Sequence, residues 1–409
     1  MTSLPSVAKP APESRKRPLR LARRMSRMGA SAVREILKVT ERPDIISFAG
    51  GLPAPELFPV KAIAEAHETV FSSQGSAALQ YSTTEGWKPL REWIGRRMQS
   101  RGINADSDNV LITSGSQQGI DLVARIFLEA GDVVVVENPC YLAALQAFSA
   151  YEATMIGVGS DEAGMRVDQV ERVLMESAPK LIYVVSDFSN PKGTSLSLDR
   201  RARLVELSRR YNVPILEDDP YSELRYRGQP SPSLASLDED GLVIYLSTFS
   251  KTLSPGMRIG WVAASSELIY ALVIAKQATD LHTSTIEQRA ASTLLETFDY
   301  DGHISELNRV YGSRCFSMLE ALESHFPKGM RWTQPEGGLF LWVELPEGVR
   351  ADALLEVALR RKVAFVPGAP FFVNAPRRDF IRLNFSNQST EMIEEGIERL
   401  GRAIREQVS

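Results

Sequence analysis

The chain has 409 residues, 44% of them hydrophobic, and its formal net charge is −4. This length exceeds the roughly 250–300 residues at which a single hydrophobic core stops growing, so we expect one large and one small domain. Interspersed charges of both signs do not indicate a nucleic-acid or membrane partner, and no apolar run in the sequence approaches the ~20 residues that span a bilayer.

The cysteine and histidine content narrows the possible chemistry. Cys140 and Cys315 are the only cysteines, which excludes a disulfide framework and a cysteine-rich zinc site. The four histidines lack metal-ligand spacing, so we expect no metal ion. This content favours a reducing, cytoplasmic setting.

Residues 1–28 form a basic arm rich in proline and serine, which we expect to be flexible. Its Arg23-Arg24 pair resembles a twin-arginine signal only superficially, because a short, charged segment follows instead of an apolar signal core. The alternative to a flexible arm is an arm that packs on a partner subunit.

A short helix is predicted over residues 30–38, and residues 45–55 are predicted to form a strand that breaks into a Gly/Pro turn.

The middle of the chain alternates apolar strands with helices, which predicts an α/β sheet flanked by helices. Strands are predicted at residues 110–113, 133–136, 181–185, 213–216, 242–246 and 259–264, with helices at 117–129 and 199–210 among them.

The pattern changes after about residue 290, where a smaller α+β unit is predicted. It consists of a helix over residues 300–325, strands at 339–343, 363–366 and 380–385, and a helix over 390–405. We therefore assign residues 61–296 to the large domain, and residues 29–60 with 297–409 to the small domain.

Lys251 is the most informative residue. The apolar strand at 242–246 ends just before it, Ser250 precedes it, and Arg258 follows seven positions later. A lysine at a strand end beside hydroxyls and an arginine suits a cofactor with an aldehyde and a phosphate, namely pyridoxal 5′-phosphate held as a Schiff base. Arg258 can place a fixed fork on the phosphate.

Further polar residues follow other strands, and the carboxyl ends of strands are where ligands bind in open α/β sheets. Ser116 and Gln117 open a helix whose N–H groups can hold phosphate, with an ordinary N-cap as the alternative. Asp218 can pair with a protonated pyridine nitrogen, and the alternatives are a metal ligand or a turn cap. Tyr221 and Asn190 can reach the phenolic oxygen of the same ring, although Asn-Pro is also a common turn.

Two residues are candidates for substrate or ring contacts. Arg382 lies inside an apolar strand, where a charge is costly unless it is paired. A substrate carboxylate could pair with it, and a permanent internal salt bridge is the alternative. Tyr141 could stack on a planar ring or pack in the core.

These residues resemble the motifs of fold-type I pyridoxal-phosphate-dependent aminotransferases of classes I and II, and in particular the branch with 2-aminoadipate aminotransferase and kynurenine aminotransferase II. The matching segments occur in the family's order over about residues 30–400, at 47–53, 80–82, 115–119, 190–191, 217–221, 249–260 and Arg382.

The resemblance implies a large domain with a mostly parallel seven-stranded sheet sandwiched by helices, plus a smaller α+β domain. It implies that Lys251 is the Schiff-base lysine and proton shuttle, and that Asp218 binds the pyridine nitrogen. The remaining cofactor contacts that it implies are Ser116, Gln117, Ser250 and Arg258 at the phosphate, Asn190 and Tyr221 at the phenolic oxygen, and Tyr141 on the ring.

The resemblance also implies a homodimer, in which Tyr81 reaches the phosphate of the neighbouring subunit's cofactor. Arg382 would clamp the substrate carboxylate, with Asn190, Gly51 and Tyr141 nearby. One segment departs from the family pattern, because Ser186, Ser189 and Lys192 replace the usual residues around Asn190. The exact substrate therefore stays open.

The predicted function is transfer of an amino group from an L-amino acid to a 2-oxo acid of the 2-oxoglutarate or pyruvate type, by a ping-pong mechanism, in amino-acid or specialised-metabolite biosynthesis. An enzyme of the same fold with another carbanion fate (elimination, decarboxylation or oxidation) is the alternative. A ligand-sensing transcription regulator would need a preceding winged-helix domain of roughly 70 residues, and the enzyme-like region begins too early for one.

Overall fold

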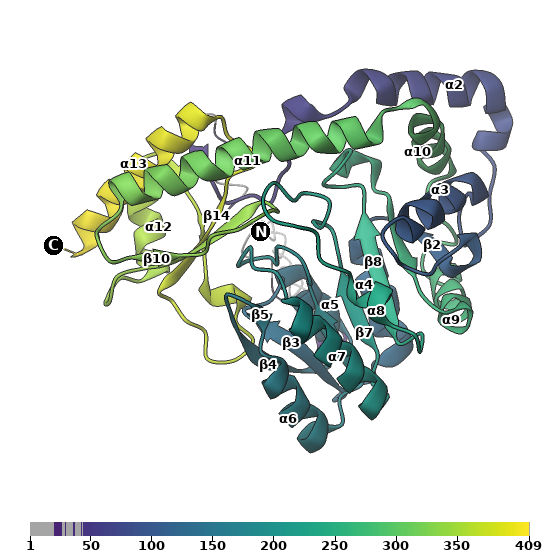
Figure 1. The fold of residues 1–409 in the computed structure, drawn as a ribbon, viewed down its shortest axis with the longest axis horizontal. Helices are drawn as coiled ribbons and strands as arrows, with labels where there is room; N and C mark the ends of the chain where they lie inside the picture. Colours follow the sequence, from purple (N-terminus) through teal and green to yellow (C-terminus); the bar gives the residue numbers. More distant parts are fainter. Residues whose placement is uncertain (1–19, 27–28, 30–35, 37–41, 43, 409) are drawn as a thin grey trace, which may run out of the picture.

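The computed structural model describes residues 20–26, 29, 36, 42 and 44–408. Three sheets form the framework of this part of the chain, one of eight strands, one of four and one of two, and helices cover the two larger ones (Figure 1). Most of the predicted basic arm and of the helix at 30–38 lies outside the described residues. Of the arm, residues 23–26 form a short 3-10 helix in which Arg23 pairs with Glu152. No helix within the described residues combines the length and apolarity needed to cross a membrane.

The large sheet has the strand order β2-β9-β8-β7-β6-β3-β4-β5. Its strands are β2 (Val110–Thr113), β3 (Val133–Asn138), β4 (Thr154–Asp161), β5 (Gly164–Met165), β6 (Leu181–Val184), β7 (Ile215–Asp218), β8 (Val243–Thr248) and β9 (Gly260–Ala263). The five strands that lie side by side in the order β4, β3, β6, β7 and β8 all pair in parallel. Strand β9 pairs antiparallel with both β8 and β2. The mostly parallel seven-stranded sheet is thus confirmed, and the two-residue strand β5 adds an antiparallel eighth at one edge.

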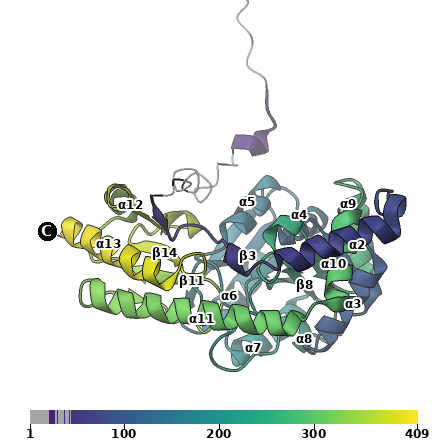
Figure 2. The same cartoon turned by 90° about the horizontal axis from the view of Figure 1, so that it is seen from above.

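Apolar side chains on both faces of the central strands explain why helices cover both sides. Along β3, Val135 packs into one core cluster with α6 and α7, whereas Val134 and Val136 pack into the other. Figure 2 shows α4 and α5 on one side of the sheet and α7 and α8 on the other. The helices of this region are α2 (Val60–Ala78), α3 (Lys88–Gln99), α4 (Ser116–Phe127), α5 (Leu142–Ala150), α6 (Val167–Ser177), α7 (Leu198–Tyr211), α8 (Leu234–Leu237), α9 (Ser266–Gln277) and α10 (Thr285–Thr297).

The small domain contains an antiparallel sheet with the order β10-β11-β14-β13. Its strands are β10 (Arg331–Trp332), β11 (Phe340–Glu344), β13 (Val366–Pro367) and β14 (Phe380–Asn384), while β1 (Ile46–Ser47) pairs in parallel with β12 (Val363–Ala364). The predicted strand at 363–366 is therefore two short strands that belong to different sheets. The helices are α11 (Tyr300–His325), α12 (Ala351–Arg360) and α13 (Thr390–Val408). Helix α11 runs from the large domain to α13 in Figure 1 and connects the two units.

Candidate active site

Lys251 lies in the turn directly after the buried strand β8. Its Nζ donates a hydrogen bond to the carbonyl oxygen of Gly51 over 2.8 Å, so these two predicted residues are brought together. Loss of solvation, with the positive charges of Arg382 and Arg258, lowers the pKa of Lys251 to about 8. An amine with this pKa exchanges protons readily near neutral pH, as a nucleophile or a general base must.

Asp218 is the last residue of β7 and is buried. Its Oδ2 accepts a hydrogen bond from the Tyr183 hydroxyl over 2.7 Å, while its Oδ1 has no hydrogen-bond partner within the described residues. Burial raises the pKa of Asp218 to about 7. A buried acceptor without a donor costs about 1–3 kcal/mol, so this oxygen is suited to a proton-bearing group of a ligand.

Asp219 has a different environment, although it is next in the sequence. Its Oδ2 accepts hydrogen bonds from Arg101 Nη2 at 2.9 Å, the Tyr245 hydroxyl at 2.7 Å and Ser222 Oγ at 2.6 Å. The Arg101 guanidinium and these donors outweigh burial and lower the pKa of Asp219. The geometry therefore favours Asp218 over Asp219 as the ligand-facing carboxylate, as the sequence predicts.

The N-terminus of α4 and the turn after β8 approach each other closely around Arg258. Gly115 precedes α4 at φ +77°, and a Cβ atom there would lie 2.3 Å from Arg258 Nη2. Arg258 Nη2 donates to the carbonyl oxygen of Ser114 over 3.2 Å, and Ser250 Oγ lies 2.8 Å from Thr248 Oγ1. Free N–H groups of a first helical turn, a guanidinium and a hydroxyl form a cradle suited to a phosphate.

Within this cradle, Ser116 and Gln117 occupy the first turn of α4, as predicted. The side chain of Gln117 points elsewhere, because its Nε2 donates to the carbonyl oxygen of Ala143 over 3.0 Å. Gln117 can therefore offer its backbone N–H to an anion, but not its side-chain amide.

Arg382 connects the small domain to the loop after β6. Its Nη1 donates to Asn190 Oδ1 over 2.8 Å, its Nη2 donates to the carbonyl oxygen of Ala49 over 2.7 Å, and its buried Nε has no partner within the described residues. Burial lowers the pKa of Arg382 to about 10. No carboxylate among residues 44–408 lies within ion-pair distance of this guanidinium, so the alternative of a permanent internal salt bridge is wrong for this part of the chain. The guanidinium instead lies over the Phe340 ring, 4.4 Å from its centroid.

Tyr221, Tyr141 and Asn190 gather around the same guanidinium. Burial, the neighbouring Tyr141 and Asp218 raise the pKa of Tyr221, whereas Arg382 and a hydrogen bond with Asn190 act in the opposite direction. Tyr141 caps α5 and is close enough to raise the pKa of Arg382 in turn. The Tyr221 phenol is therefore a neutral hydrogen-bonding group at neutral pH.

Tyr81 differs from most of the other predicted site residues in its exposure to solvent. Its side chain is 78% exposed, and its ring packs edge-on against His282 with 5.8 Å between centroids. An exposed position is compatible with a role in a partner subunit's site. Tyr183 is the residue that sequence reasoning missed. A tyrosine within the apolar run of β6 is a signal for it, because a buried hydroxyl needs a partner.

The donor set fits pyridoxal phosphate. The amine of Lys251 suits the aldehyde of that cofactor, the cradle with the exposed Arg258 suits its phosphate, and the unpaired oxygen of Asp218 suits its ring nitrogen. The buried guanidinium of Arg382 suits a substrate carboxylate. Within the described residues no group of His, Cys, Asp or Glu side chains is arranged to hold a metal ion.

Comparisons with known proteins agree with this chemistry. Residues 43–400 match the family described as aminotransferase class I and II. Aromatic-amino-acid aminotransferase 1 from Thermococcus litoralis is 46% identical over 93% of each chain. A crystal structure of kynurenine aminotransferase from Pyrococcus horikoshii in complex with PMP is 44% identical, with a TM-score of 0.91, over 95% of this chain and 98% of that chain. An alpha-aminoadipate aminotransferase from Thermus thermophilus, complexed with N-(5′-phosphopyridoxyl)-L-leucine, is 40% identical with a TM-score of 0.89 over the same shares.

Proposed function

The chain belongs to the class I and II aminotransferase family, whose cofactor is pyridoxal 5′-phosphate, and we propose that it transfers an amino group from an L-amino acid to a 2-oxo acid with Lys251 as the central residue. The observation that carries this proposal is the lysine after β8, whose pKa is lowered to about 8, together with the unpaired buried oxygen of Asp218. The cofactor, when bound, supplies an electron sink for the charge left at the substrate's α-carbon.

Lys251 has two roles in this proposal. Its Nζ would hold the cofactor through the aldehyde carbon at rest, until the substrate amine takes that place. The freed Nζ moves a proton from the substrate's α-carbon as a general base and returns it as a general acid. The pKa near 8 suits both roles, because neither protonation state is strongly disfavoured near neutral pH.

Asp218 and Tyr183 act together on the cofactor ring. Asp218 Oδ1 would hold the proton-bearing nitrogen of the ring, while the Tyr183 hydroxyl fixes the carboxylate through Oδ2. A cation at Oδ1 would lower the pKa of Asp218 from about 7, so the carboxylate would stay ionised.

The other predicted residues bind and orient the reactants. The backbone of Ser116 and Gln117, with Ser250 and Arg258, holds the phosphate. Asn190 and Tyr221 would donate to the phenolic oxygen, and Tyr141 would stack on the ring. Arg382 binds the substrate carboxylate as a fork, next to Asn190 and Gly51.

The amino donor is the finer part of the proposal. Relatives act on aromatic amino acids, kynurenine and 2-aminoadipate by their names, which supports a donor with a large side chain. A panel of L-amino acids with 2-oxoglutarate or pyruvate as acceptor tests this. Glutamate or alanine should appear in a 1:1 ratio with the 2-oxo acid of the donor. Release of ammonia or carbon dioxide in place of amino transfer would instead support elimination, oxidation or decarboxylation.

We also propose a homodimer that completes the site. Helix α2 and the segment after it expose several large apolar side chains, and such a patch on a folded chain marks an interaction surface. They are Val60, Phe71, Leu79 and Tyr81. Tyr81 of one subunit would reach the phosphate in the other.

A cytoplasmic location is proposed from the two buried cysteines, which are both free.

A further inference from the structure

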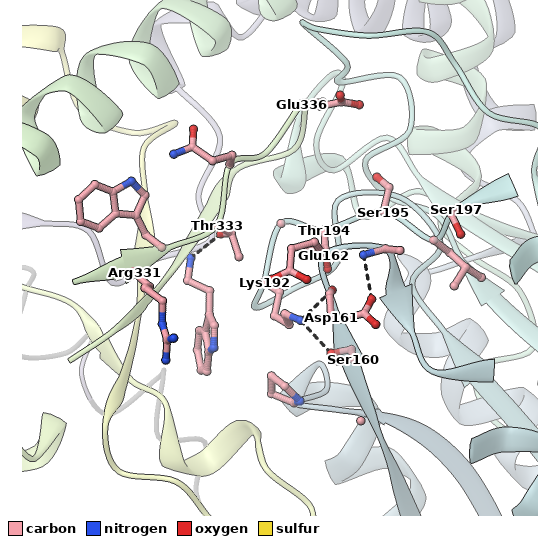
Figure 3. A pocket seen from close by; sticks show the side chains of 18 of the residues that line it. Ser160, Asp161, Glu162, Lys192, Thr194, Ser195, Ser197, Arg331, Thr333 and Glu336 are labelled. Atoms are coloured by element: carbon pink, nitrogen blue, oxygen red, sulfur yellow. Dashed lines mark hydrogen bonds between the residues drawn. The ribbon is translucent and has the colours of Figure 1, made fainter. Parts of the chain in front are cut away.

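A cavity of about 850 Å³ opens between the large and small domains, and none of the residues assigned to the active site lines it. Small-molecule sites typically have volumes of about 300–1,000 Å³. Figure 3 shows Lys192, Ser160 and Asp161 on one side of this cavity and Arg331 and Thr333 on the other. The proposed amino transfer therefore assigns no function to this cavity.

The large-domain wall contains a buried ammonium group that has no ionic partner. Lys192 is 8% exposed, and its Nζ donates to Ser160 Oγ and to the carbonyl oxygen of Asp161, each over 3.0 Å. No carboxylate of the described residues lies within ion-pair distance of this Nζ. The nearby carboxylate of Asp161 is held by Arg200 at 2.7 and 2.8 Å.

Glu137 is the other acidic group next to Lys192. It is buried, and its Oε1 has no hydrogen-bond partner within residues 44–408. Burial raises the pKa of Glu137, whereas the charge of Lys192 and a hydrogen bond with Ser160 act in the opposite direction. Burial also lowers the pKa of Lys192, and an anion bound next to it would raise this pKa again. The wall therefore presents one positive charge that the protein itself does not neutralise by direct contact.

The small-domain wall is aromatic. Trp342 stacks on Phe380 with 5.3 Å between ring centroids and 9° between planes, and Phe372 lies 6.1 Å from Phe380. Trp332 from β10 lines the same wall. Trp332, Phe372 and Phe380 are half-buried and Trp342 is buried, so the wall offers ring surface on which a planar apolar ligand can pack.

The remaining acidic residues of the lining make no ion pair with Lys192, although the charge of Glu162 raises its pKa. Glu336 pairs with Arg225 at 2.8 Å, and Glu344 pairs with Arg331 at 2.7 Å. Glu162 is exposed to solvent.

We propose that this interdomain cavity is a second binding site, which takes a small aromatic carboxylate with its anionic group at Lys192 and its ring against Trp332, Trp342, Phe372 and Phe380. Lys192 is also the residue that departs from the family pattern after Asn190. The ligand would touch both domains, so its binding would favour one arrangement of them.

Calorimetric titration of the pyridoxal-phosphate-loaded enzyme with 1-naphthoate tests this site. We expect one 1-naphthoate per subunit, and a Kd that rises at least ~10-fold in Lys192→Met, because a hydrogen bond to a charged group is lost. The uncharged analogue 1-naphthylmethanol should bind the wild type and Lys192→Met equally weakly. Lys180→Met removes the same charge from an exposed lysine and should leave the Kd for 1-naphthoate unchanged.

Two further variants keep the test decisive. Arg382→Gln should bind 1-naphthoate as the wild type does, because Arg382 belongs to the other site. Trp332→Leu should weaken both probes by a similar factor, and it provides a second test if Lys192→Met does not fold. The proposal is overturned if the wild type does not bind 1-naphthoate, if Arg382→Gln abolishes the binding, or if folded Lys192→Met and Trp332→Leu both bind as the wild type does.

Discussion

Arg382 of the small domain donates a hydrogen bond to Asn190 of the large domain over 2.8 Å. The contact joins strand β14 to the loop after β6, at a point where no carboxylate of the described residues neutralises the buried guanidinium. A substrate carboxylate would provide that missing charge, so the two domains share the proposed recognition of the substrate.

Replacing Arg382 by lysine should lower kcat/KM for every amino donor by about 10²–10³-fold, because the ammonium group of lysine cannot make the bidentate contact of a guanidinium. Steady-state kinetics with several donors measure this. A loss confined to one donor would mean that Arg382 contacts the side chain of that donor and not the α-carboxylate that all donors share.

Tyr183→Phe should lower the affinity for pyridoxal phosphate and kcat by about tenfold, since the buried Asp218 Oδ2 then loses its donor at a cost of about 1–2 kcal/mol. Asp218→Asn should reduce kcat much further, because the ring nitrogen loses its ionic partner. Tyr245→Phe, which removes a donor from Asp219 instead, serves as the matched control and should leave kcat within a few-fold of wild type.

The lowered pKa of Lys251 predicts a pH dependence of stability in the cofactor-free protein. The pKa falls from its ordinary value of 10.5 to about 8 on folding, so between these pH values the unfolded chain binds more protons at this residue. The free energy of unfolding therefore rises with pH in this window, by up to about 3 kcal/mol from this group. The difference between wild type and Lys251→Met, measured by urea unfolding at pH 7.5 and pH 10.5, isolates the contribution. A difference that does not change with pH would contradict the lowered pKa.

Mixing two defective variants tests whether Tyr81 acts across the subunit interface. Lys251→Ala and Tyr81→Ala should each be impaired alone, but a hybrid dimer has one site with both residues intact. Random reassortment makes half of the dimers hybrid, so activity should recover to about a quarter of the wild-type value. No recovery in verified hybrids would place Tyr81 in its own subunit's site or outside the site altogether.

Much of this architecture is predictable from the sequence, because local patterns determine it. The helix over residues 300–325 has its predicted bounds, and Lys251 and Asp218 lie at the ends of their strands because apolar runs precede them. Strand β4 was not predicted, since Gly157 and Gly159 interrupt its apolar pattern, and strand β5 is only two residues long.

The contacts between distant elements could not be read from local patterns. The Tyr183–Asp218 hydrogen bond depends on β6 and β7 being neighbours in the sheet. The separation of residues 363–366 into two strands depends on pairing with β1 and β14, which lie far away in the sequence. The direction of the Gln117 side chain likewise depends on α5, which contacts α4.

Single-turnover mixing of the pyridoxal-phosphate-loaded enzyme with an L-amino acid, without any acceptor, tests whether Lys251 drives amino transfer. We expect one equivalent of 2-oxo acid per subunit, no free ammonia, and a rate at least ~10²-fold lower in Lys251→Ala, because the general base is lost. Release of ammonia with the 2-oxo acid, or an undiminished rate in Lys251→Ala, would contradict this expectation.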